Sequence, residues 1–289
     1  MKRPRAGRII NISFLLGFCF LCVYPYWNVV IYALNDSTDA LKGSLYLLPR
    51  VPTLFNFSEL LKNIEIVRAF GVSVFRTAFG VVTSVVMNAM FAYAFSKKYL
   101  IGRNFIKWMV VIPLYFAPGI VPMYIVLKQL HLTNSLLTYI IPHIYGSYII
   151  IILHSFFVTI PRSLEEAAKI DGAGDGMIFF RIVWPTSKPV LAYIALFQAL
   201  WHWNDWFIGA TYIFDQKIIP VQTLLLNMIK ERAADVMLDP SSFAEGRREV
   251  TAKSLQMAMI VITTVPILMV YPFLQKYFVQ GIMIGSIKG

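Results

Sequence analysis

Long apolar segments separated by short polar loops dominate the chain. They cover about 9–34, 70–95, 108–127, 138–160, 190–213 and 257–274. Each is close to the roughly 20 residues that a membrane-spanning helix needs. The pattern predicts an all-α membrane protein with about six transmembrane helices, and we expect residues 1–289 to form a single transmembrane domain.

The third apolar segment contains three prolines, Pro113, Pro118 and Pro122. Proline removes a helix hydrogen bond, and lipid cannot satisfy the backbone groups that this frees. The prolines therefore predict a break that lies against another helix or against a hydrated cavity. A kinked packing helix and a helix that lines a pathway are both compatible with this pattern.

Composition supports a membrane protein. The chain is 58% hydrophobic and 14% charged, whereas an average globular domain has roughly 25% charged residues. The mean hydropathy is +0.65 and the net charge is +11. The basic residues are spread over short loops and form no aromatic-basic patch, so we do not expect nucleic acid as a partner.

The distribution of Lys and Arg predicts the topology. The tail 1–8 and the short loops 96–107 and 161–189 each contain four of them. Because basic residues concentrate in short cytoplasmic loops, both termini and loop 161–189 are expected in the cytoplasm, as parts of a multi-pass protein of the cell membrane. Cys19 and Cys22 have no neighbouring histidine, and no metal site is expected.

Loop 161–189 contains a polar stretch, "SLEEAAKIDGAGDGMIFFRIVWP". Ser163 and Glu166 fit a capping box just after Pro161, so a short helix is expected to begin here. Gly172 favours a sharp turn, after which "MIFFRIVW" forms a second helical piece that ends at Pro185. The pattern predicts two helices along the membrane surface, which serve either as a docking surface or as a plain connector.

The spacing within this loop resembles the EAA signature of the membrane subunits of binding-protein-dependent ABC importers. Its elements are Glu166-Ala167-Ala168, Gly172, Ile182 and Trp184-Pro185, with Trp184 where leucine is usual. The stretches "GRNF", "WNDW" and "LQKYFVQGIMIGSIKG" narrow the resemblance to the carbohydrate-uptake branch. The chain is similar to the smaller permease of the maltose importer and to permeases of the polysaccharide and alginate type.

This resemblance implies the type I permease fold of ABC importers. It also implies a second, related permease, two cytoplasmic ATPase subunits, an external solute-binding protein and a saccharide cargo, an oligosaccharide or a polysaccharide fragment. The loop would be the helix that couples to the ATPases, and the tail from Gln275 should touch them. The residues implied in coupling are Glu166, Ala167, Ala168, Asp171, Gly172 and Ala173.

The chain itself is not expected to be an enzyme. It contains no GxxxxGK[ST] stretch, so ATP and Mg²⁺ are expected on the ATPase subunits, and no cofactor is expected on this chain. Two other classes of function remain open. An ion-driven secondary transporter would need ion ligands on broken helices, whereas Asp205 is the one acid within the predicted spans. A membrane-embedded enzyme acting on lipid-linked sugars would need clustered carboxylates or a metal.

The fifth apolar segment contains the candidate residues of a substrate pathway. Helical spacing places five residues on one face, with Asn204 beside them. Carboxylate, amide and indole groups suit sugar hydroxyls and the apolar faces of sugar rings. The same groups could instead join helices or form an aromatic belt at the outer interface. The residues on the face are Gln198, Trp201, Asp205, Gly209 and Tyr212.

Overall fold

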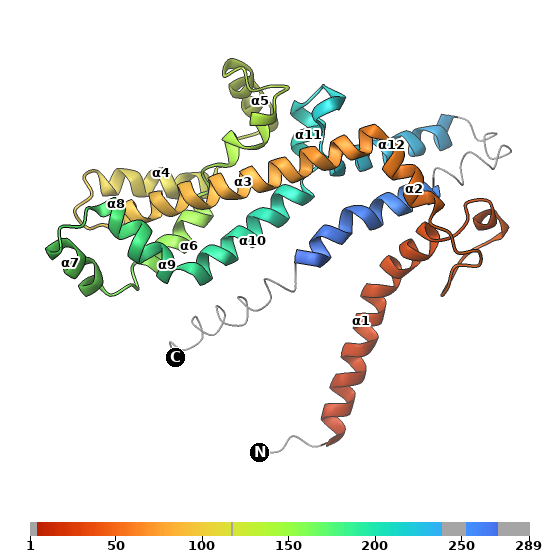
Figure 1. Ribbon diagram of the computed structural model, residues 1–289, viewed down its shortest axis with the longest axis horizontal. Coiled ribbons are helices and arrows are strands. Elements are labelled where there is room, and N and C mark those ends of the chain that lie inside the picture. The colour runs from red at the N-terminus through yellow and green to blue at the C-terminus, as the bar shows by residue number, and fades with distance from the viewer. Residues whose placement is uncertain (1–4, 117, 239–252, 271–289) are drawn as a thin grey trace. The chain divides into compact units, whose positions relative to one another are not determined.

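The computed structural model describes residues 5–116, 118–238 and 253–270 (Figure 1). Three helices in these ranges are long and apolar enough to cross a membrane: Gly7–Ala33 within α1 (Arg5–Ala33), α3 (Ile64–Ser96) and Lys253–Val270. They correspond to the first, second and sixth predicted spans. The all-α class is confirmed, while the count of six spans and the placement of the termini stay predictions. The tail from Gln275 lies outside the described residues.

The chain divides into two compact units, each made of two stretches of sequence. The first comprises Met1–Val67 and Leu224–Pro266, and the second comprises Arg68–Thr223 and Ile267–Gly289. The expectation of a single transmembrane domain stays a prediction.

In the first unit a polar cluster follows the end of α1. The Asn56 side chain donates to the carbonyl oxygens of Ala33 and Asn35, at 2.9 and 3.0 Å. Arg50 Nε and Asn35 Nδ2 both donate to Asp39 Oδ2, at 2.8 and 3.2 Å. These bonds satisfy buried backbone and side-chain groups where the helix ends. Further helices of the first unit are η1 (Asp39–Lys42) and α2 (Phe55–Lys62). Helix α12 (Val221–Leu238) begins in the second unit and continues in the first.

In the second unit α3 is the long central helix, and its small residues allow close packing. Ala89 and Ala92 are fully buried in the core beside residues of later helices such as Ile150 and Ile194. Small residues let membrane helices approach closely. The later elements are α4 (Arg103–Tyr115), α5 (Ile120–Gln129), η2 (Leu136–Tyr139), η3 (Ile141–His143), α6 (Ser147–Phe157), α7 (Arg162–Ile170), α8 (Asp175–Ile178), η4 (Phe179–Val183), α9 (Trp184–Thr186), α10 (Lys188–Asn204), α11 (Phe207–Tyr212) and η5 (Gln216–Ile218).

A glycine marks the crossing of α3 and α10. A Cβ atom built on Gly80 would lie 2.3 Å from Nε2 of His202, which is far inside van der Waals contact. His202 is fully buried. The two helices can therefore pack at this distance only because position 80 carries no side chain.

The third and fourth predicted spans are both broken. The prolines of the third predict its interruption, and this is confirmed, because α4 ends at Tyr115 and α5 begins at Ile120. The fourth bends by 46° between Leu136–His143 and α6. At this bend the Asn88 side chain of α3 donates to Ile144 O at 2.7 Å and accepts from Gly146 N at 2.8 Å. Asn88 thus supplies the hydrogen bonds that lipid could not.

The fifth predicted span is not one helix. α10 ends at Asn204, Asp205 is extended (φ −72°, ψ 118°), and α11 begins at Phe207. The expectation of a single helical face from Gln198 to Tyr212 was therefore wrong, because a change of backbone direction at Asp205 separates the residues before it from those after it. Asp205 instead accepts hydrogen bonds from α3, which stabilise the break.

Candidate functional site

The EAA loop (residues 161–189) begins with α7, but not through a capping box. Pro161 is the N-cap and no side chain caps the helix there. Proline favours a fixed φ, here −58°, that leads directly into the helix, so α7 begins at Arg162. Ser163 therefore lies inside the first turn, where it cannot act as the N-cap, and the predicted capping box was wrong.

The end of α7 forms a complete glycine-dependent cap. Gly172 N donates to Lys169 O at 3.0 Å, and Ala173 N donates to Ala168 O at 2.9 Å. This pair of bonds defines a Schellman motif, which needs a left-handed residue after the helix. Gly172 has φ +82°, so the predicted sharp turn is confirmed at this position. Ala168 and Ala173 are half-buried and pack together against the core of the unit.

The second helical piece continues beyond its predicted end. It consists of α8, the π-helical segment η4 and α9, which ends at Thr186 rather than at Pro185. Pro185 is the second residue of α9, directly after the π-helical segment, so the proline does not end the helical piece. The prediction of two helical pieces joined by a turn is confirmed, with this correction to the boundary.

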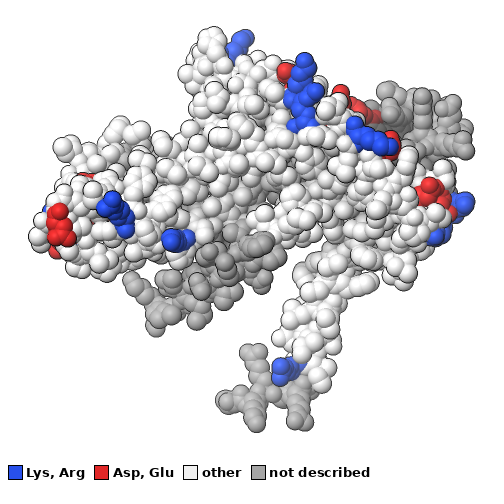
Figure 2. Space-filling model, in the orientation of Figure 1, with Lys and Arg blue, Asp and Glu red and all other residues white. Residues whose placement is uncertain are grey.

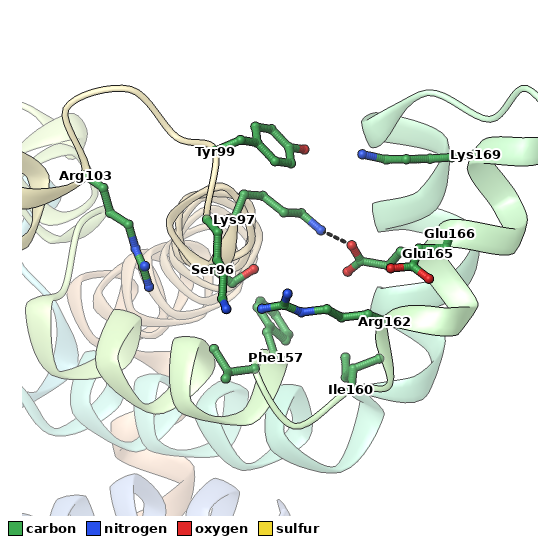
Figure 3. A pocket seen from close by; sticks show the side chains of 12 residues that line it. Ser96, Lys97, Tyr99, Arg103, Phe157, Ile160, Arg162, Glu165, Glu166 and Lys169 are labelled. Atoms are coloured by element: carbon green, nitrogen blue, oxygen red, sulfur yellow. Dashed lines mark hydrogen bonds and ion pairs between the residues drawn. The ribbon is translucent and has the colours of Figure 1, made fainter.

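Two neighbouring glutamates of α7 point to different surroundings. Glu165 is half-buried and forms an ion pair with Lys97 at the end of α3 (Figure 3). Lys97 Nζ also lies 3.8 Å from the centroid of the Tyr93 ring. Glu166, the glutamate of the EAA signature, is exposed. The ion pair attaches α7 to α3 and leaves Glu166 free for another contact.

A second set of contacts attaches the far side of the loop. Tyr99 Oη donates to Asp175 Oδ2 at 3.0 Å, and Lys169 Nζ lies 3.4 Å from Asp175 Oδ1. Burial and the hydrogen bond to Asp175 raise the pKa of Tyr99. Burial also raises the pKa of Asp175, but the Tyr99 hydroxyl and the Lys169 charge outweigh it and hold that pKa below its ordinary value. Asp175 is therefore a carboxylate at neutral pH.

The remaining candidate residues of the loop form its outward surface. Ala167, Asp171 and Gly172 are exposed, as is Ile170 at 87%. Between this helix and the ends of α3 and α6 lies a cavity of about 270 Å³ (Figure 3). The sequence pattern found the exposed residues but not Lys97, Tyr99, Glu165 or Asp175, because nothing in the local spacing shows which charges meet across 68 or 76 positions.

The candidate pathway residue Asp205 is part of an ion pair inside the second unit. Arg76 Nη2 lies 2.8 Å from Asp205 Oδ2, and Arg76 Nη1 donates to Asp205 O at 3.0 Å. The Arg76 side chain is fully buried, and its guanidinium lies 4.5 Å from the centroid of the Tyr139 ring. Arg76 was not among the candidates, although the sequence offered a signal: a lone cation and a lone acid within predicted spans.

The other candidate pathway residues are dispersed. Gln198 Nε2 donates to Ser84 Oγ at 3.0 Å, and Asn204 Nδ2 donates to Leu200 O at 2.9 Å. The indole of Trp201 is 41% exposed and its ring contacts the His143 ring at a centroid distance of 4.4 Å. Tyr212 is buried. Trp201 and Asn204 therefore remain accessible, while Gln198 and Tyr212 bind neighbouring parts of the protein.

Gly209 has a packing role. A Cβ atom at this position would lie 2.2 Å from Thr223 Oγ1 and 2.8 Å from Pro220 Cδ. The glycine lets α11 lie against the start of α12 within the second unit.

Apolar segments interrupted within predicted spans, with a charged two-helix loop between two of them, are features expected of the membrane subunit of a transporter. Residues 80–284 match the family described as binding-protein-dependent transport system inner membrane component. The chain is 36% identical to the polygalacturonan/rhamnogalacturonan transport system permease protein YtcP of Bacillus subtilis (strain 168), over 96% of both chains. The chain therefore belongs to this family, and the expected family is confirmed.

Two further similarities extend over nearly the whole length. The arabinooligosaccharides transport system permease protein AraQ of Halalkalibacterium halodurans is 28% identical and covers 100% of both chains. A chain in the crystal structure of a bacterial ABC transporter involved in the import of the acidic polysaccharide alginate is 28% identical, with a TM-score of 0.85 over 96% of this chain and 99% of that one. The permease fold of ABC importers is thereby confirmed.

Proposed function

We propose that this chain is a membrane-spanning permease subunit of a binding-protein-dependent ABC importer for a saccharide. It forms the translocation pathway with a second, related permease, and an external solute-binding protein delivers the cargo. Both termini and the EAA loop lie in the cytoplasm of a prokaryotic cell. Similarity to sugar permeases along nearly the whole chain supports this function.

The cargo we propose is a fragment of an acidic polysaccharide. The relative YtcP is named for polygalacturonan and rhamnogalacturonan, and the alginate transporter imports an acidic polysaccharide. All three polymers contain uronic acids, whose carboxylates make such a cargo anionic. Trp201 and Asn204 are the accessible pathway candidates for sugar rings and hydroxyls.

The EAA loop is the proposed contact with the cytoplasmic ATPases. One observation carries this assignment. Glu165 forms an ion pair with Lys97, whereas Glu166 on the same helix is exposed. A helix fixed on one side and open on the other can transfer a movement of a bound partner to α3. ATP and Mg²⁺ bind to the ATPase subunits, whose closure would favour the outward-open state by a shift of population.

The ion pair at Asp205 bears on the alternative of an ion-driven transporter. Such a transporter needs an acid that can bind the coupling ion inside the membrane. Arg76 donates to the Asp205 carboxylate through Nη2 and to the Asp205 backbone carbonyl through Nη1. This pairing favours an importer driven by ATP on its partners.

The test is transport by the complete complex in proteoliposomes. We expect uptake of oligogalacturonides that requires ATP and the binding protein, with the cargo recovered chemically unaltered. Uptake driven by an ion gradient without ATP would contradict the importer assignment, and altered cargo would indicate an enzyme. ATP-dependent uptake of neutral oligosaccharides alone would contradict the acidic cargo but not the importer.

A further inference from the structure

A second cavity, of about 360 Å³, lies between α4 and α6 beside the end of α3. Its volume is within the range of small-molecule sites, roughly 300 to 1,000 Å³. The lining contains two cations and no carboxylate, so it attracts an anion. The polar lining residues are Arg103, Asn104, Lys107 and His154.

The cations of this cavity lack an acidic partner. Among the described residues no ion pair joins Arg103 or Lys107 to a carboxylate. The two follow each other at i and i+4 on α4, where like charges repel. Figure 3 shows Arg103 on the opposite side of the α3 end from Glu165, which Lys97 already engages. An anion between the two cations would remove their repulsion.

Besides the two cations, Asn104 and His154 place hydrogen-bond donors in the lining. His154 Nε2 is buried without a hydrogen-bond partner, and the His154 ring lies 4.7 Å from the Phe95 ring, over which the Arg103 guanidinium lies at 5.9 Å. The start of α4 adds positive potential, because no side chain caps the helix at Gly102. A buried donor without a partner is unfavourable, so a ligand that accepts a hydrogen bond from it stabilises the site.

The other wall of the cavity is apolar. It is formed by Val110, Val111 and Ile151, and the adjoining outer face of α4 exposes Phe105 and Trp108. Figure 2 shows charged side chains near the α7 and α8 end of this unit and an uncharged surface over the middle of its long helices. Tryptophan and basic residues at the end of an apolar helix are typical of the membrane interface. The occupant therefore needs an anionic end and an apolar body.

We propose that this cavity binds an anionic phospholipid. Its phosphate lies between Arg103 and Lys107 and accepts from Asn104 and His154, and an acyl chain follows Val111 and Ile151. Basic pockets between membrane helices at the surface of the bilayer suit such headgroups. The site gives the stretch "GRNF" at 102–105 a role separate from saccharide transport.

The test measures lipid binding to the full-length chain, purified with its co-purifying subunits, in phosphatidylcholine nanodiscs with or without phosphatidylglycerol. Native mass spectrometry counts retained phosphatidylglycerol, and thermal unfolding reports stabilisation. We expect Lys107→Gln to weaken retention roughly fivefold and Arg103→Gln/Lys107→Gln about 25-fold, since each basic residue near an anionic surface contributes about that factor. Lys98→Gln, at the same end but in the lining of the other cavity, should retain the lipid.

Several results would overturn the proposal. Equal loss in the Lys98 variant would indicate general charge attraction, and unchanged retention in the double variant would exclude this site. Equal stabilisation by inorganic phosphate in pure phosphatidylcholine would identify a soluble anion instead of a lipid. A co-purified polypeptide cross-linked at position 107 would identify a protein contact. Lys107 is exposed and without an ion-pair partner in the described chain, so the single variant should fold even if the double variant does not.

Discussion

Individual residues fix the backbone where the regular helices stop. Gly172 adopts the left-handed conformation that completes the cap of α7, and Asp205 accepts the bonds from Arg76 where α10 ends. One position depends on the absence of a side chain and the other on a charge. Substitutions at Gly172 and at Asp205 should therefore have different effects in experiments.

At Gly172 we predict a purely conformational effect. A Cβ atom there has no neighbour within 4 Å, so side-chain size matters little, but φ +82° is unfavourable for most residues, by roughly 1 to 2 kcal/mol. Gly172→Val should uncouple ATP hydrolysis from transport, and Gly172→Asn, which tolerates this conformation, should behave close to wild type. The measurement is the ratio of transport to ATPase rate in proteoliposomes. Normal coupling in the valine variant would refute the role of the turn.

For Asp205 we predict a structural effect. Removing one member of a buried ion pair costs about 3 to 5 kcal/mol, because the other charge is left without a partner. Asp205→Ala and Arg76→Met should each lower the melting temperature and yield of the assembled complex, and the double variant should recover part of the loss. A stable, ATP-hydrolysing Asp205→Ala complex with impaired transport would instead place the carboxylate in the pathway.

At the scale of elements, the EAA loop is held to the end of α3 by two separate sets of contacts. Lys97 pairs with Glu165, and the Tyr99 hydroxyl donates to Asp175, which also pairs with Lys169 inside the loop. We expect these contacts to make the loop and the central helix move together, so that a movement of the loop would reach the part of α3 that faces Asp205.

Adjacent glutamates allow this attachment to be tested with a matched pair. We expect Glu165→Gln to increase hydrogen exchange in α7, because its ion pair is lost, and Glu166→Gln to leave exchange unchanged while weakening association with the ATPases. Hydrogen-exchange mass spectrometry and co-purification separate the two effects. The charge exchange Lys97→Glu/Glu165→Lys should restore protection. Equal exchange in both single variants would contradict the division of roles.

The sequence predicted the elements better than the contacts between them. Apolar runs located α1, α3 and the helix Lys253–Val270, since the membrane requires helices of fixed length. The break at Asp205 was missed, because Arg76 lies 129 positions away and only the folded chain brings the two together. The exposed residues of the EAA loop followed from motif spacing, whereas Glu165 had no signal that distinguished it from Glu166.

At the scale of the whole molecule, the two units differ in how charge stabilises them. The first holds Asp39 between Arg50 and Asn35 next to the end of α1. The second buries the pair of Arg76 and Asp205 among its helices. The first unit should therefore respond to acid through Asp39 and the neighbouring Asp36, whose pKa is also lowered, by hydrogen bonds from the Thr38 side chain and the Asp39 backbone.

We predict an acid dependence that maps to Asp39. The hydrogen bond from Arg50, followed by that from Asn35, holds the pKa of Asp39 below its ordinary value of 3.8. A lowered pKa in the folded state adds stability above pH 3.8, and this stability is lost as the pH falls through the folded value. Thermal unfolding across the acid range should show a flatter dependence for Asp39→Asn than for wild type. The exposed Asp171→Asn serves as control, and the same flattening there would refute the assignment.

The contact of Gly80 with the His202 ring also constrains how this protein can change over generations. Any side chain at position 80 collides with the imidazole, so a larger residue is tolerated only if position 202 becomes smaller at the same time. The two positions lie on different helices and far apart in the gene, yet position 80 cannot gain a side chain unless position 202 changes. Homologues with a larger residue at position 80 should have a smaller residue at position 202. A Gly80→Ala variant should lose function, and the added substitution His202→Ala should restore it.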